Sequence, residues 1–158
     1  MKYLTFVCGA LTALSLVLRG FAADDAAVAA KLSKFPPSAA EALRKLAGSA
    51  KIERVSIEKD GKVTVYEAAL TEPGKPNREV SVTADGKLNA DEETLPLEKV
   101  PEAPRQAIVA SAKGATIERV NRITRANGAV TFEATYASKG KKTEVEFLEN
   151  GKQKPDEK

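Results

Sequence analysis

The sequence predicts an α+β protein made of two tandem modules, each with one helix packed on a small antiparallel β-sheet. Three observations predict this fold: an internal repeat at an offset of 65 residues, from Ile52 to Ile117; a helix-type spacing of apolar residues at the start of each copy; and alternating strand patterns that end in tight-turn dipeptides. We assign residues 35–90 to module 1 and residues 100–152 to module 2.

The repeat consists of short matches that follow one another in the same order. Ile52-Glu53-Arg54-Val55 recurs unchanged as Ile117-Glu118-Arg119-Val120. The other matches are Phe35-Pro36 with Val100-Pro101, Ala42-Leu43 with Ala107-Ile108, Tyr66-Glu67-Ala68 with Phe132-Glu133-Ala134, and Glu79-Val80 with Glu144-Val145. A series of matches in one order indicates a duplication.

Residues 1–22 are typical of a secretory signal peptide. Lys2 precedes an apolar run over residues 4–18, and small residues follow up to Ala22, after which we expect cleavage; cleavage after Ala23 is the alternative. The run is shorter than the roughly 20 residues that span a bilayer, which makes an uncleaved anchor the weaker interpretation. Cys8, the only cysteine, lies too early for a lipoprotein signal. We expect a periplasmic or secreted protein without a lipid anchor, and with no membrane span after cleavage.

Helices are predicted near the start of the mature chain and in each module. Residues 23–34 are rich in alanine and predict a helical lead-in. In module 1, Ser38 and Glu41 form a capping box, and Gly48 ends the helix. In module 2, Pro101 and Pro104 fit the first turn, where a missing N–H costs little.

Strands follow each predicted helix. The residues expected on the inward faces are Tyr66, Ala68, Leu70, Val80 and Val82 in module 1, and Phe132, Ala134, Tyr136, Val145 and Phe147 in module 2. Glu67 and Glu133 alternate with them, and we expect both to be exposed. The turn dipeptides are Asp60-Gly61, Asp85-Gly86, Asn127-Gly128 and Asn150-Gly151. Calcium ligation at these pairs is the less favoured interpretation, because no ladder of oxygen ligands precedes each glycine.

The remaining segments are polar. Residues 91–99 are predicted to be an acidic linker between the modules, and residues 153–158 a charged, disordered tail.

Composition excludes several classes of function. Removal of residues 1–22 takes away Lys2 and Arg19, so the formal charge falls from +3 to +1. Such a balance argues against nucleic-acid binding. The mature chain has no Cys and no His, so it lacks a disulfide, the commonest general base and nearly every transition-metal ligand other than carboxylates. We therefore expect no catalytic residue, no cofactor and no metal site, and a protein that is not an enzyme.

Basic residues are concentrated in module 2. The possible partner-binding residues are Arg122, Arg125, Lys139, Lys141 and Lys142. A solvated sheet face is one interpretation of this pattern. The other is a docking surface for an acidic partner or an anionic envelope polymer.

The repeated motifs resemble those of the PepSY-like domain family. The resemblance rests on Ile52-x-x-Val55, Asp60-Gly61, Tyr66-x-Ala68, Val80-x-Val82 and Asp85-Gly86-Lys87, and on their counterparts in module 2. Two consecutive copies are similar in plan to β-lactamase-inhibitor-like proteins of the bacterial envelope. This resemblance implies an exported, non-enzymatic module that binds an extracytoplasmic protein and inhibits or regulates a peptidase or another envelope enzyme. The alternative is a binder of a small ligand or an anionic envelope polymer, through the basic surface of module 2.

Overall fold

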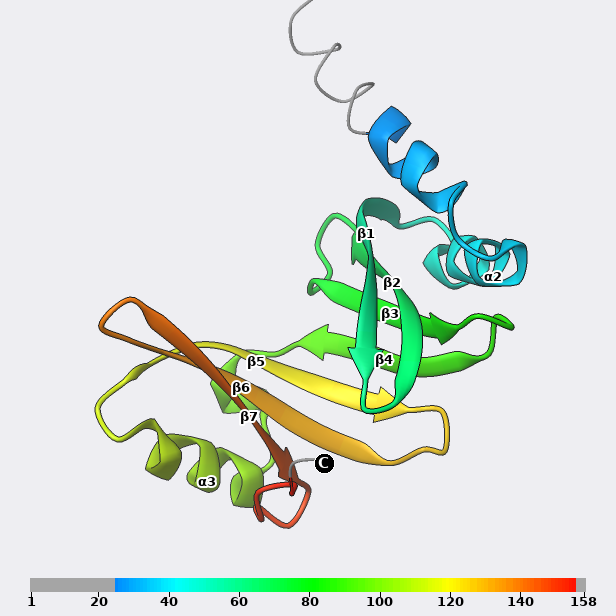
Figure 1. Ribbon diagram of the computed structural model, residues 1–158. Helices are drawn as coiled ribbons and strands as arrows, with labels where there is room; N and C mark the ends of the chain where they lie inside the picture. The colour runs from blue at the N-terminus through cyan, green and yellow to red at the C-terminus, as the bar shows by residue number, and fades with distance from the viewer. Residues whose placement is uncertain (1–24, 156–158) are drawn as a thin grey trace, which may run out of the picture.

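The computed structural model describes residues 25–155, which form an α+β protein dominated by one sheet (Figure 1). A helix over residues 25–32 comes first. The elements that follow are α2 (Pro37–Ala47), β1 (Lys51–Asp60), β2 (Val63–Thr71), β3 (Arg78–Thr83), β4 (Leu88–Thr94), the 3-10 helix η1 (Leu97–Lys99), α3 (Glu102–Ala112), β5 (Thr116–Arg125), β6 (Val130–Ser138) and β7 (Lys141–Leu148). The expected signal peptide lies outside the described residues.

All seven strands belong to a single antiparallel sheet in the order β1 to β7. The prediction of two separate helix-plus-sheet modules is therefore wrong. The segment expected to link them begins inside β4, which pairs with β3 along one edge and with β5 along the other. Each three-stranded half would otherwise expose a row of unpaired backbone N–H and C=O groups, and β4 satisfies both edges at once.

The duplicated sequence occupies equivalent places in the two halves of this sheet. β1 and β5 each carry a bulge within the repeated Ile-Glu-Arg-Val, at Glu53 and at Glu118. Tyr66 lies opposite Val82, as Phe132 lies opposite Phe147. The repeat thus accounts for the local pairing of each half, and β4 joins the halves.

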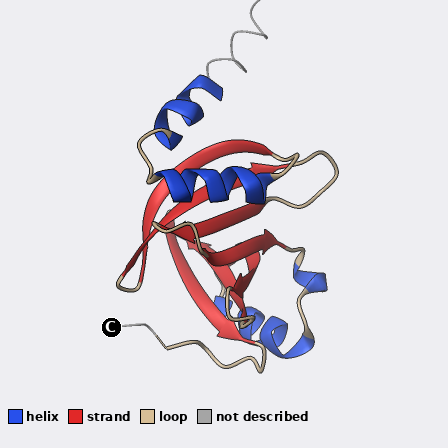
Figure 2. Cartoon of the chain, turned by 90° about the vertical axis from the view of Figure 1, so that its right-hand side faces the viewer, coloured by secondary structure: helices blue, strands red, loops and turns tan. Residues whose placement is uncertain are grey.

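Both helices pack on the same face of the sheet. Leu43 of α2 is fully buried in a cluster with Val55, Ala68 and Val80. Ile108 of α3 is fully buried in a second cluster, where its carbonyl oxygen accepts a hydrogen bond of 2.9 Å from the hydroxyl of Tyr136. Figure 2 shows α2 lying across the strands of the first half. One face of the sheet is covered, and the other has no helix on it.

The helix ends differ from the sequence-based prediction. Pro36 is the N-cap of α2, with no side-chain hydrogen bond, so the predicted capping box of Ser38 and Glu41 is wrong. The backbone around Ser38 is instead approached by a turn of the sheet. A Cβ on Gly86 would lie 2.7 Å from the carbonyl oxygen of Ser38, and one on Gly151 would lie 2.7 Å from that of Ala103 in α3.

The end of the described chain folds back along the last strand. Gln153 forms a bridge with Phe147, and the backbone N–H of Lys154 donates a 2.8 Å hydrogen bond to the carbonyl oxygen of Glu146. Residues 153–155, which we expected in a disordered tail, therefore lie against β7. Within residues 25–155, none of the helices has the length and apolar character needed to cross a membrane.

Candidate functional site

The sheet face that carries no helix is here called the open face. Strand pairing places matched side chains on it in rows, because side chains alternate between the two faces along each strand. One row runs across β1 to β5 and consists of Ser56, Glu67, Ser81, Ala90 and Arg125. A neighbouring row consists of Arg54, Ala69, Glu79, Glu92, Ile123 and Thr131. The open face is therefore continuous from one half of the molecule to the other.

The sheet curls around this face and forms a groove of about 450 Å³. Glu58 of β1 and Glu144 of β7 come from opposite edges of the sheet, yet both line this one groove. Its floor includes the apolar side chains of Val65, Ala90 and Ile123. A second hollow of about 300 Å³ adjoins it, and Glu92 borders both.

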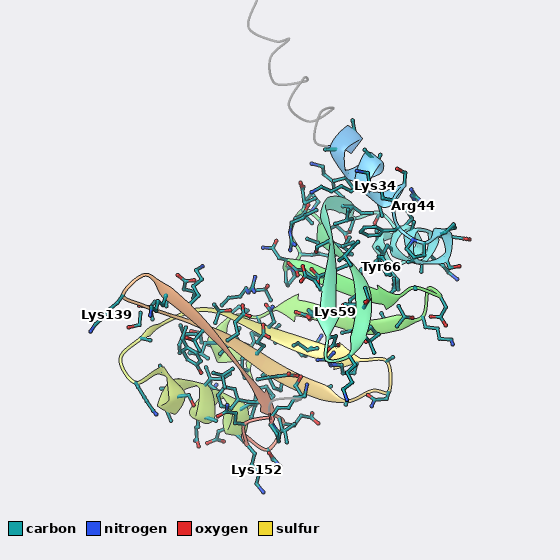
Figure 3. All side chains as sticks on the ribbon, in the orientation of Figure 1. Lys34, Arg44, Lys59, Tyr66, Lys139 and Lys152 are labelled. Carbon is teal, nitrogen blue, oxygen red and sulfur yellow. The ribbon has the colours of Figure 1, made fainter. Side chains whose placement is uncertain are left out.

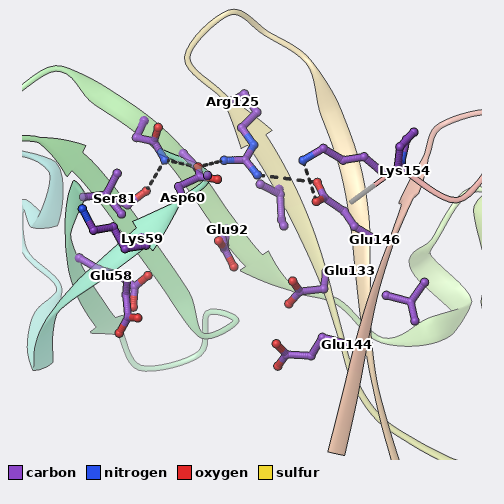
Figure 4. A pocket seen from close by; sticks show the side chains of 18 of the residues that line it. Glu58, Lys59, Asp60, Ser81, Glu92, Arg125, Glu133, Glu144, Glu146 and Lys154 are labelled. Atoms are coloured by element: carbon purple, nitrogen blue, oxygen red, sulfur yellow. Dashed lines mark hydrogen bonds and ion pairs between the residues drawn. The ribbon is translucent and has the colours of Figure 1, made fainter. Parts of the chain in front are cut away.

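Glutamates are concentrated on the open face, and some of them lie directly opposite another glutamate on the neighbouring strand. Glu79 of β3 lies directly opposite Glu92 of β4, and Glu133 of β6 lies directly opposite Glu146 of β7. Like charges in directly opposite positions destabilise a sheet. Figure 4 shows Glu92, Glu133 and Glu144 around the groove. Glu144 lies 3.7 Å from Arg119, and Glu92 accepts a 3.4 Å hydrogen bond from the side-chain amide of Asn121. Among residues 25–155, no lysine or arginine forms an ion pair with Glu92 or Glu133.

Burial and crowding raise the pKa values of three of these carboxyl groups. Desolvation, and then the charge of Glu79, raise the pKa of Glu67 to about 7. Desolvation, and then the charge of Glu133, raise the pKa of Glu92 to about 7. The pKa of Glu133 itself is raised, first by desolvation and then by the charge of Glu144. The open face consequently retains protons near neutral pH that ordinary glutamates would have lost.

Cationic groups lie at the margins of this carboxylate cluster. Arg54 donates to Glu79 at 3.1 Å, with its Nη2 atom 3.8 Å from Glu67. Lys154 lies 2.9 Å from a carboxylate oxygen of Glu146. These ion pairs leave the central glutamates, Glu92 and Glu133, without a directly contacting cation in the described chain.

A polar latch connects the first hairpin to the second half beside the groove. Asp60, at the end of β1, accepts hydrogen bonds from Arg125 of β5 and, at 2.8 Å, from Asn89. Partial burial alone would raise the pKa of Asp60, but the hydrogen bond from Asn89 and the charge of Arg125 lower it. Arg125 also reaches Glu146 at 3.8 Å. This latch fixes how closely β1 approaches β5 across the groove.

The basic residues singled out in the sequence do not form one surface. Arg122 lies on the helix-bearing face and pairs with Glu93 at 2.5 Å, whereas Arg125 lies in the groove. Lys142 pairs with Glu118 at 2.6 Å. Lys139 is at the tip of the β6–β7 hairpin, far from the groove residue Lys59 (Figure 3), and Lys141 begins β7 beside it. The role of these five residues in partner binding stays a prediction.

The residues that sequence reasoning missed are the glutamates of the open face. Glu67 and Glu133 were expected to be exposed, but both are partly buried, and Glu67 has only 15% of its side chain exposed. A signal was present in the repeat, which places Glu67 with Glu133 and Glu79 with Glu144 at matching positions. The curl of the sheet, which the repeat does not encode, brings them around one groove.

The arrangement is suited to the recognition of cationic groups. Within the described part of the chain, no group of three or more carboxylates is placed to hold a metal ion. The groove in the open face has an apolar floor and carboxylates whose negative charge is only partly balanced by nearby cations. This excess negative charge attracts cationic groups.

Comparison with known proteins identifies the fold. No protein-family model and no curated protein matches this chain. Solved structures do match it. A protein of Bacteroides eggerthii described as periplasmic has a TM-score of 0.59 and 19% identity, covering 75% of this chain and 85% of that one. A DUF2874 family protein of Bacteroides ovatus has a TM-score of 0.56 and 14% identity, with 76% and 84% covered.

A BLIP-like protein of Bacteroides fragilis also has this fold. Its TM-score is 0.52 at 24% identity, and the alignment covers 75% of this chain and 82% of that one. The similarity confirms the expected β-lactamase-inhibitor-like plan at the level of the fold. Membership of the PepSY-like family stays a prediction. This chain has the fold of a group of Bacteroides proteins that includes DUF2874 family and BLIP-like members.

Proposed function

We propose that this protein is an exported, non-enzymatic binding module that holds a protein partner on the open face of its sheet. The observation that carries the proposal is the groove between the two halves, into which carboxylates from both halves project. Both helices pack on the other face, so neither α2 nor α3 blocks a partner's approach to the groove.

Two observations support a location outside the cytoplasm. Residues 1–22 have the pattern of a cleaved signal peptide. A solved structure with this fold is described as periplasmic. In this proposal the protein meets its partner in the periplasm or after secretion.

The consequence of binding is proposed to be inhibition or regulation of an envelope enzyme. The shared fold with a BLIP-like protein favours this outcome. The mature chain has neither His nor Cys, so an effect through occupancy of a partner suits its residues better than an effect through its own chemistry.

Site-specific photocrosslinking in the native host tests the proposal. A photoreactive residue would replace Glu58 or Glu144, at the rim of the groove, or the exposed Glu41 or Val109 on the helices. We expect one protein adduct of constant size from the rim positions and little or none from the helix positions. Adducts that arise only from the helices would place the binding surface elsewhere and contradict the proposal.

A further inference from the structure

The carboxylates at the centre of the groove are only partly compensated by the described chain, where Glu92 accepts a 3.4 Å hydrogen bond from the side-chain amide of Asn121. Glu92 and Glu133 face the groove without an ion-pair partner in residues 25–155, and each lies opposite another glutamate on a neighbouring strand. The charged groups that act on these carboxylates and Glu67 are Glu79, Glu144 and Glu146, together with Arg54, Arg119 and the groove residue Arg125. Glu58, Lys59, Asp60 and Lys154 also line the groove. Like-charge pairs that reduce stability are typical of a functional surface, where an added cation relieves the repulsion.

The end of the described chain shows how a basic segment fits against this cluster. Lys154 lies on an extended stretch beside β7, with its backbone N–H bonded to Glu146 and its Nζ atom 2.9 Å from the carboxylate of the same residue. Residues 153–155 of this stretch contribute to the lining of the groove beside β7. The glutamates farther along the groove, toward β2, are reached by no such lysine.

The number of carboxylates in the groove favours a chain over a single small cation. Glu67 is on β2, Glu92 on β4 and Glu133 on β6, so the carboxylates come from three strands of the curled sheet. A chain that bears several cations can place one beside each carboxylate, whereas one ammonium group supplies a single charge.

Resting on the proposed function, we propose that the partner inserts an extended polypeptide segment bearing several Lys or Arg residues into the groove, where Glu67, Glu92 and Glu133 bind its cationic groups.

Binding of such a segment would release protons. The pKa values of Glu67 and Glu92 are near 7, so a fraction of each is protonated at neutral pH. A bound cation favours the ionised carboxylate and lowers these pKa values. By linkage, the affinity rises as the pH increases from about 6 to about 8.

Isothermal titration calorimetry of the mature chain with deca-lysine tests this chemistry. Titrations at pH 7 in two buffers of different ionisation enthalpy would measure the protons released on binding. We expect about one proton per complex, since two groups titrate near this pH. We also expect binding at pH 8 to be at least about threefold tighter than at pH 6.

Two triple variants, each with three glutamates replaced by glutamine, separate the groove from general electrostatics. E67Q/E92Q/E133Q removes three carboxyl groups from the groove, and E41Q/E98Q/E149Q removes three exposed ones outside it, which at pH 8, where all six are mostly ionised, is the more nearly equal change in charge. We expect the groove variant to weaken deca-lysine binding about tenfold or more and to abolish proton release, and the matched variant to change binding less than about twofold. Removal of like-charge repulsion should leave the groove variant folded, which circular dichroism would verify.

Three outcomes would overturn the inference. Equal weakening by both triples would show that net charge alone attracts the peptide. Binding without proton release would show that the groove glutamates do not contact the peptide. Spermine that binds as tightly as deca-lysine, with the same proton release, would assign the groove to small polyamines. In each case the photocrosslinks from the groove rim would still decide the proposed function separately.

Discussion

Glu79 lies directly opposite Glu92 across β3 and β4, so the register of the sheet brings two carboxylates together on its open face. Glu133 and Glu146 repeat this relationship in the second half. A sheet selected only for stability would place an opposite charge or an apolar residue at one of these positions. This repeated conflict supports the proposal of a cationic partner on the open face.

Neutralising Glu92 should stabilise the protein at alkaline pH. The pKa of Glu92 is about 7 in the folded chain against an ordinary value of 4.5, so the folded state binds more protons than the unfolded state between these two pH values. The stability contributed by this group is therefore full below about pH 4.5 and is lost as the pH rises through 7. Nearby Arg125 and solvent screening make the destabilisation by this carboxylate smaller than its pKa shift alone would give. We therefore expect Glu92→Gln to raise the free energy of unfolding by about 1–2 kcal/mol at pH 8.

Urea unfolding at pH 4 and pH 8 checks this expectation. The gain from Glu92→Gln should be nearly absent at pH 4, where the carboxyl group is protonated in both states. Glu41→Gln on the exposed surface of α2 is the control, and it should change stability by less than about 0.5 kcal/mol at either pH. A Glu92→Gln variant that is less stable at pH 8 would mean that this carboxylate is held by favourable contacts.

The latch at Asp60 should have the opposite dependence on pH. Asn89 and Arg125 lower the pKa of Asp60 by more than burial raises it. The ionised carboxylate therefore stabilises the fold above the unfolded-state pKa of 3.8, and this stabilisation is lost as the pH falls through the folded-state pKa. We expect Asp60→Asn to cost about 1–3 kcal/mol at pH 7 and to have a much smaller effect near pH 3. Urea unfolding at the two pH values provides the measurement. An equal cost at both would show that the carboxylate charge is not what holds the latch.

Two glycines should be intolerant of a side chain because of where their turns pack. A Cβ on Gly86 or Gly151 would lie 2.7 Å from a backbone carbonyl oxygen at the start of α2 or α3. We expect Gly86→Ala and Gly151→Ala each to cost more than about 2 kcal/mol, from steric conflict together with strain at positive φ.

Gly74→Ala is the matched control, since Gly74 also has a positive φ, of +77°, but would bring its Cβ within 4 Å of nothing. Its cost should be limited to the backbone strain, about 1 kcal/mol. Thermal unfolding of the three variants compares these costs directly. Equal costs at all three positions would show that contact with the helices is unimportant.

Export should remove the signal segment. Residues 1–22 predict that protein recovered from the native host begins at Ala23, with Asp24 as the alternative. Intact-mass measurement and amino-terminal sequencing of that protein check the cleavage site. Recovery of the envelope protein with Met1 retained would show that the segment is not cleaved.

The sequence predicted the local elements well because their patterns are local. The alternation of Tyr66, Ala68 and Leu70 predicted β2, and the turn dipeptides predicted the hairpins. β4 was missed because its stability is not local. Only Ala90 in it is buried, and its acidic residues pair across strands, as Asp91 does with Arg78 at 2.6 Å.

The candidate site could be predicted only in part for the same reason. The repeat identified Glu67 and Glu133 as equivalent strand positions facing away from the aromatic side. Joining the halves through β4 makes the open face continuous, and the curl of the sheet brings Glu58 and Glu144 around one groove. These are properties of the assembled sheet, so they cannot be predicted from the spacing of residues within a single strand.

A partner protein that binds the open face through its glutamates should be lost when those glutamates are neutralised. The most direct test measures the yield of the crosslinked adduct from a photoreactive residue at position 58 in the native host. It compares the otherwise unchanged chain with E67Q/E92Q/E133Q and E41Q/E98Q/E149Q. We predict that the groove variant lowers the yield about tenfold while the matched variant leaves it nearly unchanged. An adduct that forms equally well with the groove glutamates neutralised would contradict it.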